Sequence, residues 1–306
     1  MYNIPFIVVI IIVKNIIISI FIMIINITHN GILDNIEKYI IHNIINLPIN
    51  YGEMKEKDIN TIINKVYKKY NVNLSSNIIK SINSSYMKNH IIENHRNLYK
   101  YGALLEKYYP VKKILSLSST YKLSPITIIK YIFEKKYKKK LAYLAKNINL
   151  LDIYDRNQLY SASSDNYYQL DQTNMHIESE KFEKNVEEFL IKNKIQYVTQ
   201  EQLTKEQIEI NGKPINTPDF LIKSQFVING KKINWIDAKN FYGSNIKFIK
   251  TKINKQIVKY NQAYGSGCII FSLGYNEKYK TLVNTMSLNY NFIEELENLN
   301  DKSTKF

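Results

Sequence analysis

Apolar positions recur at helical spacing in the part of the chain that follows residue 30. In the stretch INTIINKVYKKYNV, the apolar and aromatic positions fall on one helical face: Ile59, Ile62, Ile63, Val66, Tyr67 and Tyr70. The polar break NVNLSS separates this stretch from a second helical run, NIIKSINSSYM. We therefore predict an all-helical, helix-turn-helix-like region over residues 31–97.

Residues 98–150 repeat this plan. The stretch VKKILSLSSTYKL predicts one helix, and Ser124 and Pro125 suit the N-cap and the first position of the next helix, ITIIKYIFEKKYKKK. A helix, a tight turn and a capped helix form the outline of a helix-turn-helix unit, whose second helix can enter a DNA major groove. Many helical bundles share this outline. The candidate nucleic-acid contacts in this unit are Lys122, Lys130, Lys135 and Lys136.

The pattern changes after this helical region. Residues 151–175 lose clear periodicity and gain Ser, Asn, Gln and Asp, which predicts a linker with short elements. Residues 176–292 predict an amphipathic helix, a pair of strands, a helix near 246–264 that ends at Gly265, and the short buried strand CIIFSL. A polar tail, residues 293–306, follows. We expect an α/β core at the C-terminal side, preceded by all-α helix-turn-helix-like domains.

Residues 1–30 form a separate, apolar segment. The run Ile4–Ile27 is long enough to span a bilayer, and Lys14 near its centre costs roughly 3 kcal/mol on insertion scales. About eighteen apolar residues at roughly −0.4 kcal/mol each outweigh that cost. The segment is a poor signal peptide, because no basic residue precedes the apolar run. It is either a membrane anchor or an extension outside the functional fold.

Composition adds a charge argument and removes some metal sites. The chain carries 42 Lys and Arg against 27 Asp and Glu, a net charge of +15, which favours a polyanionic partner such as nucleic acid. A biased coding composition accounts for part of this basicity. Cys268 is the only cysteine, which excludes an internal disulfide and any multi-cysteine zinc site. His90 and His95 lack the i, i+4 spacing that would place two ligands on one helical face.

The strongest short-range signal is a predicted β-hairpin. Asn229-Gly230 is a preferred two-residue turn, and apolar strands flank it on both sides. Side chains alternate along a strand, so Asp237 and Lys239 share one face. The hairpin returns Asp219 to their neighbourhood, which gathers two carboxylates and one amine.

The register of this hairpin decides whether the three groups meet. A regular ladder around a two-residue turn pairs Asp219 with Asn240 and points it away from Asp237. Sharing a face requires a three-residue loop or a bulge, and bulges are common beside active sites. We therefore predict an irregularity between Phe220 and Trp235.

Clustered carboxylates suit a hard cation, which indicates Mg²⁺ or Mn²⁺. A metal ion of this kind activates water and steadies charge on a phosphate, and Lys239 could assist, so the pattern is typical of a phosphodiester hydrolase. The competing interpretation is an exposed strand end with an ordinary ion pair. Two further side chains, Gln256 and Tyr260, lie one helical turn apart on the helix that follows. Upstream, Glu183 could add a third carboxylate, with Glu180 and Glu187 as rivals.

The motifs around these residues resemble the codanin-interacting nucleases, also described by their TPD motif, within the PD-(D/E)xK superfamily. The matching stretches are TPDF at 217–220, NWIDAKNFYG at 234–243, KNKIQYVTQEQL at 192–203, and SPITIIKYIFE in the second helix-turn-helix unit. The similarity covers roughly residues 31–290. The TPDF and WIDAK blocks together are specific, whereas the N-terminal half matches only in pattern.

This resemblance implies a restriction-endonuclease-like core akin to archaeal Holliday-junction resolvases. It implies that Asp219, Asp237, Glu183 and the backbone carbonyl of Ala238 bind the metal, and that Lys239 is the catalytic lysine. Gln256 and Tyr260 match a Gln-x-x-x-Tyr motif of related exonucleases. The resemblance also implies codanin as a partner and a nuclear or cytosolic setting. The sequence departs from the family in carrying Asp237 where members often have Glu, and in its apolar N-terminal segment.

Three hypotheses follow. The first is a Mg²⁺- or Mn²⁺-dependent, structure-selective nuclease that acts on DNA, with RNA left open as a substrate. The second is a non-catalytic nucleic-acid-binding adaptor of codanin that keeps the nuclease-like fold. The third is a membrane-anchored protein of other function, which depends on residues 4–27 alone. The sequence decides neither the oligomeric state nor whether cutting is exo or endo.

Overall fold

The computed structural model describes residues 6–13, 16–25, 31–49, 51–163, 173–279, 284–291 and 293. The chain forms two compact units, which are considered separately. The helical unit comprises Lys38–Asn174, and the α/β unit comprises Met1–Glu37 together with Met175–Phe306. Of the predicted polar tail, all but Ile293 lies outside the described residues, as does Lys14.

The helical unit is built from short helices. They are α1 (Asp34–Ile45, whose first turn belongs to the α/β unit), α2 (Glu56–Tyr70), α3 (Ser76–Asn94), α4 (Arg96–Tyr108), α5 (Ile114–Tyr121), α6 (Pro125–Tyr137), α7 (Leu141–Lys146), a 3-10 turn (Ile148–Leu150) and α8 (Ile153–Ala162). The predicted periodicity of α2 is confirmed, because Ile59, Ile62 and Val66 are buried. The predicted break after α2 is confirmed too, and Ser75 caps α3 by accepting the Ile78 N–H.

Helices α5 and α6 enclose the turn that the sequence predicted. Ser124 caps α6 by accepting the Thr127 N–H at 3.3 Å, and Pro125 occupies the first turn, as predicted. Six residues of α6 are buried: Pro125, Ile126, Ile128, Ile129, Ile132 and Phe133. Helix α6 is therefore the central helix of this core rather than a helix with one broad exposed face.

Asp155 joins three helices of the helical unit. Its carboxylate is 1% exposed and accepts hydrogen bonds from Tyr109 at 3.0 Å and Tyr137 at 2.5 Å, while the Lys136 ammonium lies 2.7 Å away. Asp155 lies in α8, inside the segment 151–175, and Leu159 and Ala162 of the same helix are buried in the core. This part of the segment thus belongs to the helical core.

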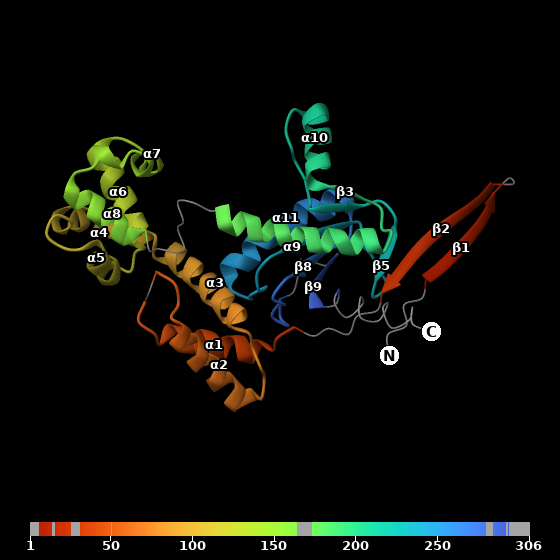
Figure 1. The fold of residues 1–306 in the computed structure, drawn as a ribbon, viewed down its shortest axis with the longest axis horizontal. Helices are drawn as coiled ribbons and strands as arrows, with labels where there is room; N and C mark the ends of the chain where they lie inside the picture. Colours follow the sequence, from red (N-terminus) through yellow and green to blue (C-terminus); the bar gives the residue numbers. More distant parts are fainter. Residues whose placement is uncertain are drawn as a thin grey trace. The chain divides into compact units, whose positions relative to one another are not determined.

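The α/β unit contains a mixed five-stranded sheet between helices (Figure 1). Its elements are α9 (Thr173–Lys192), β3 (Tyr197–Thr199), α10 (Gln200–Asn211), β4 (Phe220–Ile222), β5 (Gln225–Ile228), β6 (Lys231–Lys232), β7 (Trp235–Lys239), α11 (Lys247–Tyr264), β8 (Gly267–Phe271) and β9 (Thr285–Asn289). The strand order is β3-β4-β7-β8-β9. Strands β3, β4 and β7 pair antiparallel, whereas β7, β8 and β9 pair parallel. The mixed α/β class expected for this part is confirmed.

Alternate residues of the strands face different helices. Ile236 and Ile270 pack with Phe189 of α9, which crosses the strands in Figure 1. Trp235 and Ile269 pack instead with α10 and α11. Because Asp237 and Lys239 share the parity of Trp235, they lie on the α11 side of the sheet. The predicted end of α11 is confirmed, since Gly265 follows it with φ of 82°.

A second sheet has the order β1-β2-β5-β6 and includes β1 (Phe6–Val13) and β2 (Ile16–Ile25). These strands, red in Figure 1, pair antiparallel with each other, and β2 pairs parallel with β5. They occupy most of the apolar run that is long enough to cross a bilayer. A high content of β-branched Ile and Val favours strands in such a run. Among the described residues, no helix combines the length and apolar character needed to cross a membrane.

We predict that Asp155→Ala destabilises the protein by about 2–4 kcal/mol, because it leaves buried tyrosine hydroxyls without their acceptor. Urea unfolding followed by helical circular dichroism measures this loss. The control is Glu201→Ala, which breaks an exposed pair with Lys205 and should change stability by no more than about 0.5 kcal/mol. Equal effects of the two substitutions would contradict the assigned role of Asp155.

Candidate functional site

The register of the strands places the TPD aspartate opposite the second aspartate. Near the turn, Ile228 pairs with Lys231, which is the register of a two-residue turn at Asn229-Gly230. Farther along, Phe220 pairs with Ile236, so the preceding residue, Asp219, falls opposite Asp237. In the regular register it would have fallen opposite Asn240.

The change of register comes from three extra residues on one side of the hairpin. The Ile222 N–H donates to the Asn234 carbonyl, and the Ile233 N–H donates to the Phe226 carbonyl. Residues 223–225 therefore have no counterpart between Asn234 and Ile233. The irregularity predicted between Phe220 and Trp235 is confirmed, although it is larger than a single bulge. It also marks the point where the chain passes from one sheet to the other.

The two aspartates and the lysine meet in a buried site. The Ala238 N–H donates to Asp219 Oδ2 at 2.6 Å, and the Lys239 ammonium forms an ion pair with Asp237 Oδ2. Asp219 is 9% exposed and Asp237 1%. Apart from the ion pair, Asp237 Oδ2 accepts no hydrogen bond of normal geometry from the described residues. The ammonium is its only counter-charge there.

Crowding of like charges governs the protonation of this site. Burial raises the pKa of Asp219 well above its ordinary value, and the neighbouring Asp237 carboxylate raises it further. Burial alone would lower the pKa of Lys239, but Asp237 and Asp219 outweigh that effect and leave the pKa above its ordinary value. Lys239 is therefore an ammonium ion at neutral pH and balances only part of the negative charge.

Helix α11 orients one of the aspartates through the two side chains predicted from the sequence. Gln256 Nε2 donates to Asp237 Oδ1 at 3.3 Å and to the Tyr260 hydroxyl at 2.8 Å. The Tyr260 hydroxyl donates in turn to the Thr217 carbonyl at 3.1 Å. Both the TPD loop and the second aspartate are thus tied to one face of α11.

The structure distinguishes between the three glutamates considered for α9. Burial raises the pKa of the half-buried Glu183, and the Asp237 carboxylate adds to this, while Lys239 opposes it. Glu183 is therefore close enough to interact with the site. Glu187 instead accepts a hydrogen bond from the Tyr197 hydroxyl at 2.8 Å, and the exposed Glu180 lies 3.4 Å from His176.

The donor set suits a cation held by two carboxylates. Within the described residues, no group of three or more His, Cys, Asp or Glu side chains is placed to hold a metal ion by itself. Mg²⁺ commonly binds through one or two carboxylates and takes its other ligands from water and substrate phosphates. The paired Asp219 and Asp237 carry more negative charge than Lys239 neutralises, so these residues fit such an ion.

The lysines predicted for nucleic-acid contact are not equivalent. Lys135 lies 2.6 Å from Glu106, and Lys136 bridges Asp152 and Asp155. Lys130 and Lys122 are exposed, and Lys122 ends α5 in a left-handed conformation with φ of 53°. The structure therefore assigns two of the four lysines to intramolecular ion pairs.

A buried network next to the site was not predicted from the sequence. Glu37, 2% exposed, accepts hydrogen bonds from Tyr242 at 3.2 Å and Ser244 at 2.5 Å, from the Asn245 N–H, and from Asn276. These residues hold the loop that leads from Lys239 to α11. The only sequence signal was the aromatic-Gly that follows WIDAK, because Glu37 lies in a region whose pattern is simply helical.

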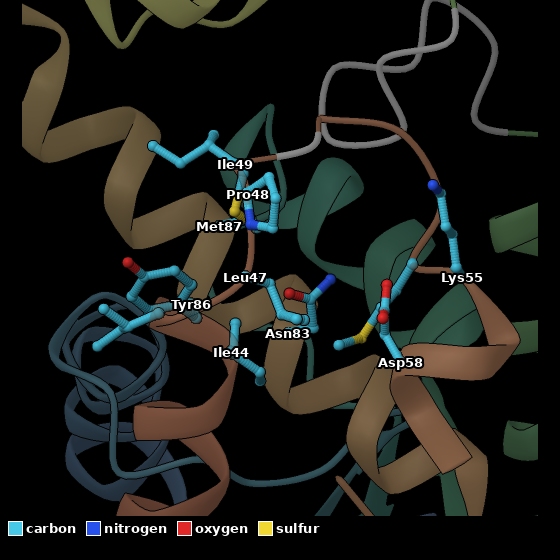
Figure 2. Close-up of a pocket in the computed structure, with 11 residues that line it drawn as sticks. Ile44, Leu47, Pro48, Ile49, Lys55, Asp58, Asn83, Tyr86 and Met87 are labelled. Atoms are coloured by element: carbon cyan, nitrogen blue, oxygen red, sulfur yellow. The ribbon is translucent and has the colours of Figure 1, made fainter. Parts of the chain in front are cut away.

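A hollow of about 370 Å³ lies in the helical unit (Figure 2). Ile44, Leu47, Pro48 and Met87 line its apolar part, and Lys55 and Asp58 lie at its polar part. None of the residues that the sequence predicts for the site lines this hollow, and its largely apolar lining offers no catalytic group.

We predict that Glu37→Gln changes how stability depends on pH. Burial raises the pKa of Glu37 above 4.5 despite its hydrogen bonds, so the folded chain keeps a proton that the unfolded chain has released. The wild type should therefore lose stability relative to Glu37→Gln as pH rises from about 4.5 through the folded pKa. Urea unfolding between pH 4 and 7 measures this, with Glu188→Gln, an exposed position, as the control. A constant difference between wild type and Glu37→Gln would contradict the prediction.

Comparison with known proteins gives one match. A search of curated proteins and a search of solved structures each found no significant match to this chain. Residues 152–291, which include α9, the five-stranded sheet and every residue of the acidic site, match a family described as "Protein of unknown function TPD sequence-motif". The TPD motif inferred from the sequence is therefore present in the sense in which that family defines it.

Proposed function

We propose that this protein is a metal-dependent nuclease of the PD-(D/E)xK type. The observation that carries the proposal is the direct opposition of Asp219 and Asp237 on adjacent strands, both buried, with Lys239 against one of them. Buried like charges are costly unless they serve a ligand or a reaction. A restriction-endonuclease-like core is the finer fold that we propose, supported by a mixed central sheet with α9 and α11 on opposite faces.

Each residue of the site has a definable task in this proposal. Asp219, Asp237 and the Ala238 carbonyl would hold Mg²⁺ or Mn²⁺, with Glu183 near enough to contribute. When bound, the metal supplies a water of lowered pKa and positive charge for the phosphate. The Lys239 ammonium stabilises negative charge that develops on the phosphate, and Gln256 and Tyr260 keep Asp237 oriented.

The proposed substrate is DNA, with RNA as a second possibility. Its support is the net charge of +15, which attracts phosphate backbones, together with a carboxylate pair suited to a phosphate-binding cation. The resemblance to codanin-interacting nucleases also motivates codanin as a proposed partner and the nucleus or cytosol as the proposed setting. Co-precipitation of the two proteins from cells tests the partnership.

A non-catalytic nucleic-acid-binding adaptor is the second candidate. The observation in its favour is the ion pair between Lys239 and Asp237, which gives one carboxylate a counter-ion from the protein itself. The raised pKa of Asp219 weighs against it, because the remaining carboxylate is left without full compensation. Metal binding distinguishes the two candidates.

We predict Mg²⁺-dependent cleavage in a panel of branched, single-stranded and duplex DNA. Asp237→Asn and Lys239→Ala should each lower the rate by about 100-fold or more, since each removes a group that acts on the reacting phosphate. EDTA should abolish cleavage and Mn²⁺ should restore it. The controls are Glu201→Gln and Lys205→Ala, an exposed acid and base of the same unit. Unchanged cleavage by Asp237→Asn would show that the activity came from a contaminant.

We also predict opposite effects of Asp219→Asn on stability and on metal binding. Without metal, the substitution should raise the melting temperature, because it removes one of two crowded charges while an amide oxygen can still accept the Ala238 N–H. With Mn²⁺, the wild type should gain stability as ligand concentration exceeds Kd, and the variant should gain none. Thermal unfolding with and without Mn²⁺ measures both effects. Equal stabilisation of both proteins by Mn²⁺ would contradict the assigned metal site.

A further inference from the structure

The positive charge of the chain is concentrated in the helical unit. Residues 38–174 contain 22 Lys and Arg against 10 Asp and Glu, a net charge of +12 out of the +15 of the whole chain. The α/β unit, with the proposed catalytic site, therefore carries only +3. A polyanion is thus attracted mainly by the helical unit.

Many lysines of the helical unit are neutralised by ion pairs, but one group is not. Lys80, Lys135 and Lys136 contact Glu56, Glu106 and Asp155 respectively. Six exposed lysines at the ends of α4 and α6 have no acid within ion-pair distance in the part of the chain that the structure describes. These six, called the lysine rim below, are Lys107, Lys112, Lys113, Lys138, Lys139 and Lys140.

The Asp155 network brings the two halves of the lysine rim together. Tyr109, between Lys107 and Lys112, and Tyr137, next to Lys138, donate to the two oxygens of the same carboxylate. The Tyr154 hydroxyl also donates to the Tyr109 and Lys112 carbonyls. Two lysine clusters that are separated in sequence are therefore fixed side by side at the start of α8.

Tyrosine rings support three of the rim lysines. The ammonium groups of Lys107 and Lys112 lie 5.6 and 5.0 Å from the Tyr108 ring centre, and that of Lys139 lies 5.1 Å from the Tyr143 ring centre. Tyr143 is 48% exposed, so its ring is also open to a stacking partner. Clustered cations beside exposed aromatic rings are typical of surfaces that follow a nucleic-acid backbone.

We propose that the lysine rim binds the phosphate backbone of nucleic acid without reading its sequence. Helix α6 is largely buried, and two of its lysines are in ion pairs, so it presents little surface for base contacts in a groove. Lysine meets phosphate as a point charge, which gives affinity and salt dependence rather than base selection. The inference rests on the proposed nucleic-acid substrate, but it does not depend on the metal site.

The test is binding of the full chain to fluorescein-labelled 30-mer single-stranded and duplex DNA in EDTA, measured by anisotropy at several salt concentrations. We expect Lys112→Gln, Lys113→Gln and Lys139→Gln combined to weaken binding about tenfold or more. The slope of log affinity against log salt should fall by about 2, at about 0.7–0.9 per lost phosphate contact. The corresponding triple arginine variant should keep wild-type affinity, which separates charge from folding.

The matched control replaces Lys55, Lys57 and Lys68 on and beside α2 with Gln, which removes the same charge from the same unit. Equal weakening by both triple variants would overturn the proposal, because the charge would then act without a defined surface. Competition by polyglutamate or by phosphatidylserine vesicles as strong as that by DNA would also overturn it. Binding without cleavage would refute the proposed nuclease alone, whereas cleavage with an unchanged KM in the rim variant would refute the rim alone.

Discussion

The candidate site depends on one feature of the backbone, the three-residue excess at Lys223–Gln225 in the hairpin between β4 and β7. Because side chains alternate along a strand, an odd shift moves Asp219 to the other face of β4. That face already carries Asp237 and Lys239. An even shift or a regular ladder would bury one carboxylate against α11 and direct the other toward α9. The meeting of two acids is therefore a consequence of register.

Bringing two carboxylates together in a buried site has an electrostatic cost that the fold offsets only in part. The Ala238 N–H and the Lys239 ammonium favour the ionised carboxylates, yet the pKa of Asp219 remains raised. Gln256 and Glu37 hold the surrounding backbone and side chains in place without adding a cation. A site that keeps uncompensated negative charge in a rigid frame is suited to a divalent ion, and this is why the nuclease proposal ranks above the adaptor.

The sequence predicted the local features well and the long-range ones poorly. Ser124-Pro125, Asn229-Gly230 and Gly265 act through their own backbone, so their cap, turn and helix end could be read directly. The need for an irregular register was also deducible, because the parity of Asp219 and Asp237 is fixed by counting. Its position at residues 223–225 was not, since it depends on the chain leaving one sheet for another.

Glu37 could not be predicted because its partners lie more than 200 residues away. The same holds for the lysines of α6. Their spacing suggested an exposed helix face, but packing against α4 and α8 placed Lys135 and Lys136 beside acids instead. Tertiary contacts thus moved the available positive charge from α6 to the lysine rim.

The central claim is that Asp219 and Asp237 share one divalent ion. Anomalous diffraction at the manganese edge, from crystals of the full chain soaked in Mn²⁺, tests it most directly. The account predicts a single strong peak within bonding distance of both carboxylates, with the Lys239 ammonium nearby. Absence of a peak at this position, or carboxylates that point to opposite faces of the sheet, would contradict it.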